Sequence, residues 1–293
     1  MREKKLIQFY LTNRCNSRCK TCPIWKCKEK EDLKLECVKE FILANKDADF
    51  VYGGGEFFLY PFYNELLEWS EYNDINYTIL TNGIMSESIK QTISKYIPNV
   101  TISWDGTKHD EIRGIPGNSE KIKELVKYIR AAGGKVKLSY TFSKFNYDTI
   151  DEDMKVAKEV YGMDKLYLAL GRDSDTFSNK DELVAPKDFK PLLKHLDMFY
   201  ERDVLFLRDW ETCIDEFEGC MLPKCKSVAD VITVYSNGDI PLCQGMRSDV
   251  IWGNIYEMSQ KDLSEKMKQL KPVNCKYNND CFSLCQRRYD YEV

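Results

Sequence analysis

The feature that most constrains the fold is an alternation of short β-like runs and longer helical runs along the first two thirds of the chain. The expected strands cover residues 6–11, 49–52, 77–81, 100–104, 137–142 and 165–170, and the expected helices lie near 35–44, 63–72, 87–96, 119–131 and 151–161. Strands that alternate with helices in series form parallel sheets with right-handed crossovers. The sequence therefore predicts an α/β fold, a full or partial barrel with its chemistry at the carboxyl ends of the strands.

The pattern changes after a further expected helix near 186–200. Seven of the twelve cysteines fall in the last 81 residues. Within this part, "ITVYSNGDIPLC" at 232–243 predicts a hairpin, because Asn237-Gly238 suits a tight primed turn. We place a boundary near 202–210, which gives a first domain of residues 1–205 and a small cysteine-rich domain of residues 206–293.

Composition excludes several classes of protein. The 43 basic residues nearly balance the 47 acidic ones, so an extended nucleic-acid footprint is not expected. The N-terminus has no signal-peptide core, and no apolar run approaches the roughly 20 residues that span a bilayer. These features predict a cytoplasmic protein without a membrane partner. Twelve cysteines beside only two histidines then favour reduced thiols and thiolate-bound iron–sulfur chemistry over disulfides or mixed zinc sites.

Three of the cysteines form a compact motif directly after the first expected strand. Cys15, Cys19 and Cys22 lie within "CNSRCKTC". Three thiolates from one loop can hold three irons of a [4Fe–4S] cube and leave the fourth iron open. A structural zinc site is the alternative, and Cys27 could supply its fourth ligand. Otherwise Cys27 and Cys37 fit inert, buried thiols.

Further polar or glycine-rich segments follow the other expected strands, at 53–56 ("GGGE"), 81–83 ("TNG"), 103–106 ("SWDG") and 171–173 ("GRD"). The carboxyl ends of parallel strands share one rim, so these segments predict one site. Glycines let the backbone approach a ligand closely, and Glu56 offers a carboxylate to an ammonium group.

The cysteine motif, followed by "GGGE" after the second strand, resembles the radical S-adenosylmethionine (radical SAM) superfamily through to about residue 200. The resemblance implies a partial (β/α)6 TIM-like barrel and a cluster whose open iron binds the amino and carboxylate groups of SAM. One electron then cleaves SAM to methionine and a 5′-deoxyadenosyl radical, which abstracts a substrate hydrogen. The residue before the third cysteine, usually aromatic in the family, is Thr21; Ile24 and Trp25 follow instead.

The same resemblance implies roles for individual residues. Those expected to bind SAM are Gly54, Gly55, Glu56, Ser103, Asp105 and Arg172, the last as a fork-shaped partner for the SAM carboxylate. Asp105 could equally contact substrate, and Asn82 could touch either or only form a turn. We expect Arg113 to act in catalysis, and His109 to do so or to lie in a surface loop. Tyr140 and Lys144 are expected to line the polar barrel with them.

The late cysteines resemble the SPASM/twitch extension of radical SAM proteins, on the segments "CKSVADVITVYSNGDIPLC", "GNI" and "CKYNNDCFSLC". Such an extension carries auxiliary [4Fe–4S] clusters, and the ligand count here favours one, with a four-thiolate zinc as the alternative. Cys225 and Cys243 are the first candidates for its ligands. The resemblance adds Cys220 and Cys285, and leaves Cys275 and Cys281 spare or alternative.

Three functions stay open. The first is a SAM-dependent oxidoreductase of a small, sugar- or aminocyclitol-like molecule, favoured because only five residues precede the first strand. The second is a ribosomal-peptide maturase that forms a thioether, a carbon–carbon link or an epimer, with Cys213 as a candidate hydrogen donor. The third is a non-catalytic iron–sulfur or zinc binding protein. Either enzyme would need an electron donor such as flavodoxin or ferredoxin.

Overall fold

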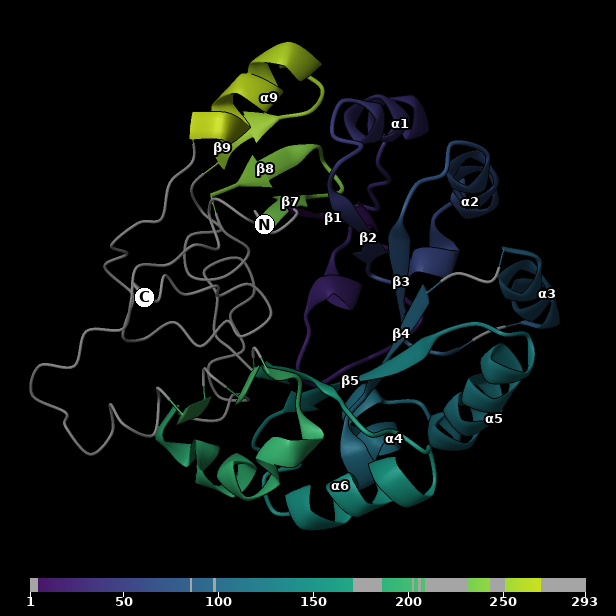
Figure 1. The fold of residues 1–293 in the computed structure, drawn as a ribbon, viewed down its shortest axis with the longest axis vertical. Helices are drawn as coiled ribbons and strands as arrows, with labels where there is room; N and C mark the ends of the chain where they lie inside the picture. The colour runs from purple at the N-terminus through teal and green to yellow at the C-terminus, as the bar shows by residue number, and fades with distance from the viewer. Residues whose placement is uncertain are drawn as a thin grey trace, which may run out of the picture.

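The structure is a computed structural model that describes residues 5–84, 86–96, 99–170, 186–201, 203–204, 207–208, 231–242 and 251–269. Seven parallel strands form one sheet in the order β6-β5-β4-β3-β2-β1-β7. They are β1 (Leu6–Thr12), β2 (Asp49–Gly54), β3 (Tyr77–Thr81), β4 (Asn99–Trp104), β5 (Val136–Phe142), β6 (Tyr167–Leu170) and β7 (Val231–Val234). The sheet curls into a half-barrel, which confirms the α/β partial barrel (Figure 1).

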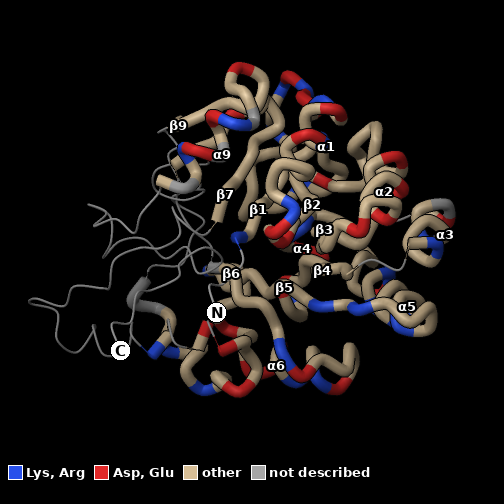
Figure 2. Tube along the Cα trace, turned by 45° about the horizontal axis from the view of Figure 1, so that its top comes forward, with Lys and Arg blue, Asp and Glu red and all other residues tan. Residues whose placement is uncertain are grey.

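Helices cover the convex face of this sheet, as the outer arc in Figure 1 shows. They are α1 (Leu35–Leu43), α2 (Tyr63–Tyr72), α3 (Glu87–Tyr96), α5 (Asn118–Ala131) and α6 (Ile150–Glu159). The short helix α4 (His109–Arg113) lies inside this arc. A 3-10 helix, η5 (Pro186–Met198), follows where an ordinary helix was expected; it contains Pro191, which removes a backbone donor. Basic and acidic residues are both spread over the molecule in Figure 2, although α2 carries acidic residues alone, in keeping with the near balance of charge.

Side-chain alternation along the strands separates the core from the site. On β1, Ile7, Phe9 and Leu11 are fully buried in the core, whereas Gln8 and Tyr10 point the other way and reach a cavity. The same alternation corrects one expectation: Tyr140 of β5 belongs to the buried face, where it packs on Trp104. It therefore does not line the barrel interior, and Lys144 is exposed.

The expected hairpin at 232–243 is wrong in its pairing, although its turn is present. Gly238 has a φ of 90° and its amide donates to the Tyr235 carbonyl at 2.8 Å. The two arms belong to different sheets, because β7 pairs in parallel with β1, and β8 (Asp239–Pro241) pairs antiparallel with β9 (Ile251–Asn254). A strand from the expected second domain thus extends the first domain's sheet. The boundary near 202–210 itself stays a prediction.

Helix α9 (Gln260–Gln269) follows β9. Within the described ranges, no helix combines the length and the apolar character that crossing a bilayer requires.

Candidate active site

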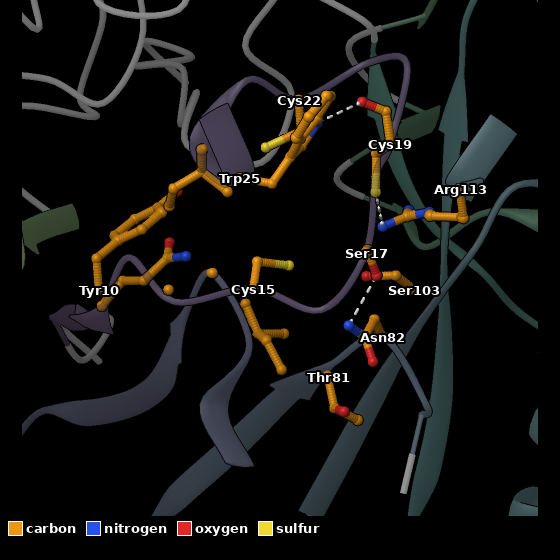
Figure 3. Close-up of a pocket in the computed structure, with 15 residues that line it drawn as sticks. Tyr10, Cys15, Ser17, Cys19, Cys22, Trp25, Thr81, Asn82, Ser103 and Arg113 are labelled. Atoms are coloured by element: carbon orange, nitrogen blue, oxygen red, sulfur yellow. Dashed lines mark hydrogen bonds between the residues drawn. The ribbon is translucent and has the colours of Figure 1, made fainter. Parts of the chain in front are cut away.

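A cavity of about 160 Å³ opens at the carboxyl ends of the first four strands. Figure 3 shows that side chains from the cysteine loop, from β1, β3 and β4 and from the end of α4 point toward it. Cys15, Cys19 and Cys22 all line this cavity, whereas the exposed Cys27 does not. The spacing of the motif therefore brought its three thiols to one space, as expected. The expectation that Cys27 is buried is wrong.

The loop that carries these thiols is closed at its base by hydrogen bonds. The Asn13 amide donates to the Glu31 carbonyl at 3.1 Å, and the Leu33 amide donates to the Leu11 carbonyl at 2.8 Å. Asp32 adds side-chain contacts, accepting from Thr12 Oγ1 at 2.6 Å and from Arg14 Nε at 3.0 Å. The base of the loop is thus set by protein contacts that leave the thiols uninvolved.

The three thiols suit an iron–sulfur cluster in which each of three irons is bound by one thiolate. Among the described residues, no three Cys, His, Asp or Glu side chains converge as the ligands of a single metal ion would. The thiols instead lie around the cavity (Figure 3). Burial raises the pKa of Cys15, and it raises the pKa of Cys22 to about 11. Without a metal these thiols keep their protons, which they would release on binding iron.

The glycine-rich turn packs directly on the first residues of the cysteine loop. A Cβ on Gly54, whose φ is 129°, would lie 2.4 Å from the Thr12 carbonyl oxygen. A Cβ on Gly55 would lie 2.3 Å from the Arg14 carbonyl oxygen. The two backbones also bond to each other, from the Gly55 amide to the Thr12 carbonyl at 2.7 Å and from the Glu56 amide to the Arg14 carbonyl at 2.8 Å. Only glycine allows this contact, which leaves Gly54 and Gly55 in the cavity wall.

Glu56 uses its carboxylate inside the protein. The side chain is buried and accepts hydrogen bonds from Thr81 Oγ1 at 2.8 Å, from the Asn82 amide at 2.8 Å and from the Phe58 amide at 3.3 Å. Burial raises its pKa to about 7, against the opposing effect of these donors. The carboxylate thus ties the end of β2 to the end of β3, and it does not line the cavity. That Gly54, Gly55 and Glu56 contact the amino group of SAM stays a prediction.

The end of β4 places Ser103 at the cavity, the end of α4 places Arg113 there, and Asp105 lies behind them. Ser103 lines the cavity, whereas Asp105 is completely buried. Its carboxylate accepts from Arg113 Nη2 at 2.9 Å and from Arg113 Nε. Burial alone would raise the pKa of Asp105, but the adjacent guanidinium outweighs it and lowers that pKa. Asp105 is therefore placed to hold Arg113.

His109 lies in the core, and the expected surface loop is wrong for this residue. It is completely buried, accepts a hydrogen bond from the Asp105 amide on Nδ1 at 3.1 Å, and contacts Asn118 Nδ2 through Nε2 at 3.0 Å. Burial lowers its pKa to about 4, so the imidazole is neutral at physiological pH. His109 thus supports the segment between β4 and α4.

Asn82 does more than form a turn. Its Nδ2 donates to Ser17 Oγ at 2.8 Å (Figure 3) and to Asn16 Oδ1 at 2.7 Å, both in the cysteine loop. Thr81, from the predicted 81–83 segment, lines the cavity, whereas sequence reasoning missed Gln8, Tyr10, Ser17 and Leu80 there. Gln8 and Tyr10 could have been found, since they alternate with three apolar core residues on the first strand. Ile24 and Trp25, noted after the unusual Thr21, both line the cavity.

Several predicted residues lie outside the described residues. They are Arg172, Cys213, Cys220, Cys225, Cys243, Cys275, Cys281 and Cys285. Their expected roles in SAM binding, hydrogen donation and an auxiliary cluster stay predictions.

Comparison with known families identifies this arrangement. Residues 9–157, about half of the chain, match the radical SAM superfamily, over a range that contains the cysteine loop, the glycine turn and the β4–α4 segment. The chain belongs to the radical SAM superfamily. Membership implies an enzyme that uses SAM and a [4Fe–4S] cluster, and the three thiols at the cavity suit that cluster.

Two curated proteins are among those with similar sequences. The AdoMet-dependent heme synthase of Methanosarcina barkeri is 23% identical over 251 residues, covering 82% of this chain and 71% of the relative. The sporulation killing factor maturation protein SkfB of Bacillus subtilis is 25% identical over 286 residues, covering 91% and 67%.

Solved structures share the fold. Streptococcus suis SuiB bound to S-adenosylmethionine superimposes with a TM-score of 0.67 at 18% identity, over 98% of this chain and 76% of SuiB. Native anSMEcpe with bound AdoMet gives a TM-score of 0.67 at 19% identity, over 94% and 87%. At these identities the likeness concerns the fold alone.

Proposed function

We propose that this protein is a radical SAM enzyme that modifies a peptide. The observation that carries the chemistry is the meeting of Cys15, Cys19 and Cys22 at one cavity with the Gly54–Gly55 backbone. When bound, a cluster held by these cysteines would supply the electron for cleavage of SAM to methionine and a 5′-deoxyadenosyl radical. The protein's own part is to hold the cluster, to orient SAM and to place the substrate carbon near the site of cleavage.

The residues at the cavity divide this work. The three cysteines would bind the irons, and the glycine turn would present backbone groups to the SAM ammonium. Ser103 and, outside the described residues, Arg172 are proposed for the SAM carboxylate. Ile24, Trp25 and Tyr10 supply apolar and aromatic surface on the same cavity, which suits the flat face of an adenine.

The peptide substrate is supported by the similar proteins. SkfB is a maturation protein, SuiB has been solved with its precursor peptide SuiA at a TM-score of 0.66, and anSMEcpe with a peptide at 0.65. The small-molecule oxidoreductase expected first from the sequence has less support. One auxiliary [4Fe–4S] cluster on four of the late cysteines and reduction by a flavodoxin or ferredoxin belong to the same proposal.

Two measurements test it. Anaerobically reconstituted protein given SAM and dithionite should release 5′-deoxyadenosine, and Cys15→Ala should abolish this release while Cys27→Ala preserves it. No 5′-deoxyadenosine from the wild type would instead support the non-catalytic binding protein.

Peptide modification is then tested by mass spectrometry of candidate precursor peptides incubated in deuterated water. A gain of deuterium at one α-carbon indicates epimerisation, and a loss of two hydrogens indicates a cross-link or an oxidation. Turnover of a sugar, an aminocyclitol or a tetrapyrrole without any peptide turnover would overturn the peptide assignment and leave the SAM chemistry in place.

A further inference from the structure

We propose that Arg113 positions the Cys19 thiol and raises the reduction potential of the cluster that Cys19 helps to bind. The proposal rests on the proposed function only in requiring a cluster on the three thiols. Its basis is two independent contacts: the Arg113 side chain reaches Cys19 itself, and the backbone of residues 112–113 binds the residues on either side of Cys19.

The backbone contact lies on both sides of Cys19. The Arg18 amide donates to the Arg113 carbonyl at 3.0 Å, and the Lys20 amide donates to the Ile112 carbonyl at 2.8 Å. The last two carbonyls of the short helix α4 are thereby satisfied by the cysteine loop. Gly114 follows with a φ of 67°, and its bare Cα faces Arg18, where a Cβ would lie 3.0 Å from the Arg18 Cβ. The glycine lets the two segments approach each other at this point.

The side-chain contact uses all three nitrogens of the guanidinium. Nε and Nη2 bind the buried carboxylate of Asp105, and Nη1 points to Cys19 Sγ at 3.8 Å (Figure 3). Asp105 is fixed in turn, since its amide donates to buried His109. A planar fork held on one edge by a carboxylate has its remaining N–H groups fixed in direction, and those on Nη1 lie on the Cys19 side. Lysine could pair with Asp105 or approach the sulfur, but it could not hold this geometry.

The electrostatic consequence follows from what reduction does to the cluster. An added electron makes the cluster and its thiolates more negative, so a donor N–H with positive charge stabilises the reduced form more than the oxidised form. The side chain of Arg113 is only 12% exposed, so water screens the interaction weakly. Asp105 offsets part of the charge but lies on the far side of the guanidinium from the sulfur. The part of this ion pair that contacts Cys19 Sγ is the positively charged donor, which fixes the sign as an increase in potential.

The test is a redox titration of the full-length, anaerobically reconstituted protein, followed by the EPR signal of the reduced cluster. It is run without SAM, so that any role of Arg113 in binding SAM does not enter. The main variant is Asp105→Asn with Arg113→Met, because Arg113→Met alone would leave a buried carboxylate without its partner. Arg113→Lys is the milder companion, which keeps the charge for Asp105 and removes the fork.

Lys20→Met is the matched control, since Lys20 is adjacent to Cys19 but directs its ammonium to Glu111 at 2.7 Å. We expect the double variant to lower the ratio of reduced to oxidised cluster about tenfold at a fixed potential, a shift of about 59 mV for one electron. Arg113→Lys should give a smaller shift, and Lys20→Met none. Iron lost from the Arg113 variants but kept by Lys20→Met also supports the positioning role.

Full iron content with an unchanged midpoint potential in both Arg113 variants would overturn the proposal. Because the readouts need neither SAM nor a peptide, that result leaves the proposed function intact. A wild-type chain that binds no iron–sulfur cluster would instead overturn the proposed function itself.

Discussion

Replacement of Gly54 by alanine should destabilise the metal-free protein far more than the same change at Gly53, one residue earlier on β2. At Gly54 the new Cβ would lie 2.4 Å from the Thr12 carbonyl oxygen, and the backbone φ of 129° is one that L-residues rarely adopt. At Gly53 the new Cβ would meet only the Leu80 side chain, at an ordinary 3.4 Å. The two variants add the same atom to the same strand, so their difference isolates the close contact.

The expected size follows from two costs. A residue held in such a backbone conformation costs about 1–3 kcal/mol, and overpacking against an anchored backbone adds about 1–3 kcal/mol. Thr12 cannot move cheaply, because its carbonyl accepts from the Gly55 amide and its hydroxyl donates to Asp32. We therefore expect Gly54→Ala to lose about 3 kcal/mol of unfolding free energy, and Gly53→Ala less than about 1 kcal/mol.

Thermal unfolding of the metal-free protein, followed by circular dichroism, measures this difference without any contribution from cofactors. At roughly 2–4 °C per kcal/mol, Gly54→Ala should melt about 6–12 °C below the wild type. It should also bind less iron on reconstitution, because the displaced Thr12 leads directly into the cysteine loop. A melting temperature equal to that of Gly53→Ala would refute the argument that backbone contact, rather than ligand approach alone, requires glycine here.

Three other expectations can be measured on the same protein. Cys22→Ala should lower bound iron and abolish SAM cleavage, whereas exposed Cys27→Ala should change neither in iron and 5′-deoxyadenosine assays. Burial lowers the pKa of His109 to about 4, so as the pH falls the unfolded chain binds a proton on this residue before the folded chain does. The free energy of unfolding should therefore decrease as the pH falls from about 6.5 toward 4. His109→Gln should remove this part of the pH dependence, measured by urea titrations at several pH values. Asn82→Ala removes two hydrogen bonds to the cysteine loop, so it should lower the free energy of unfolding by about 1–3 kcal/mol and reduce the amount of bound iron. The control Asn76→Ala, on the surface, should have a negligible effect. Thermal melts and iron analysis measure both.

The sequence predicted those elements that depend on residues close together along the chain. The expected helices at 63–72 and 87–96 have the bounds of α2 and α3. The helical spacing of apolar residues that predicts each helix lies entirely within that helix, so no distant part of the chain is needed to recognise it. The pairing of β7 could not be predicted in this way. Its partner β1 lies more than 200 residues earlier, and the Asn237-Gly238 turn favours a hairpin on local grounds alone. The turn is present, but the apolar strand before it pairs with β1, where all four of its residues are buried.

The candidate site divides along the same line. The three cysteines and the two cavity glycines could be predicted, because spacing along a loop or turn decides where they go. The partner of each charged side chain could not. Glu56 was expected to offer its carboxylate to an ammonium group, and the sequence did not reveal that Thr81 and Asn82, at the end of β3, donate hydrogen bonds to it. Arg113 and Asp105 were both expected at the site, and only the path of α4 reveals that one of them holds the other.

The cysteine loop has little regular structure, and neighbouring elements determine its course. Asp32 closes its base, the glycine turn lies under its first residues, Asn82 binds its middle and the end of α4 binds both sides of Cys19. Each of these contacts uses backbone or side-chain groups other than the thiols. The loop can therefore take its course before any metal is bound, and iron then needs only to displace protons from thiols already gathered at the cavity. This order predicts that the metal-free protein unfolds cooperatively, and that reconstitution raises its melting temperature without changing its helix content.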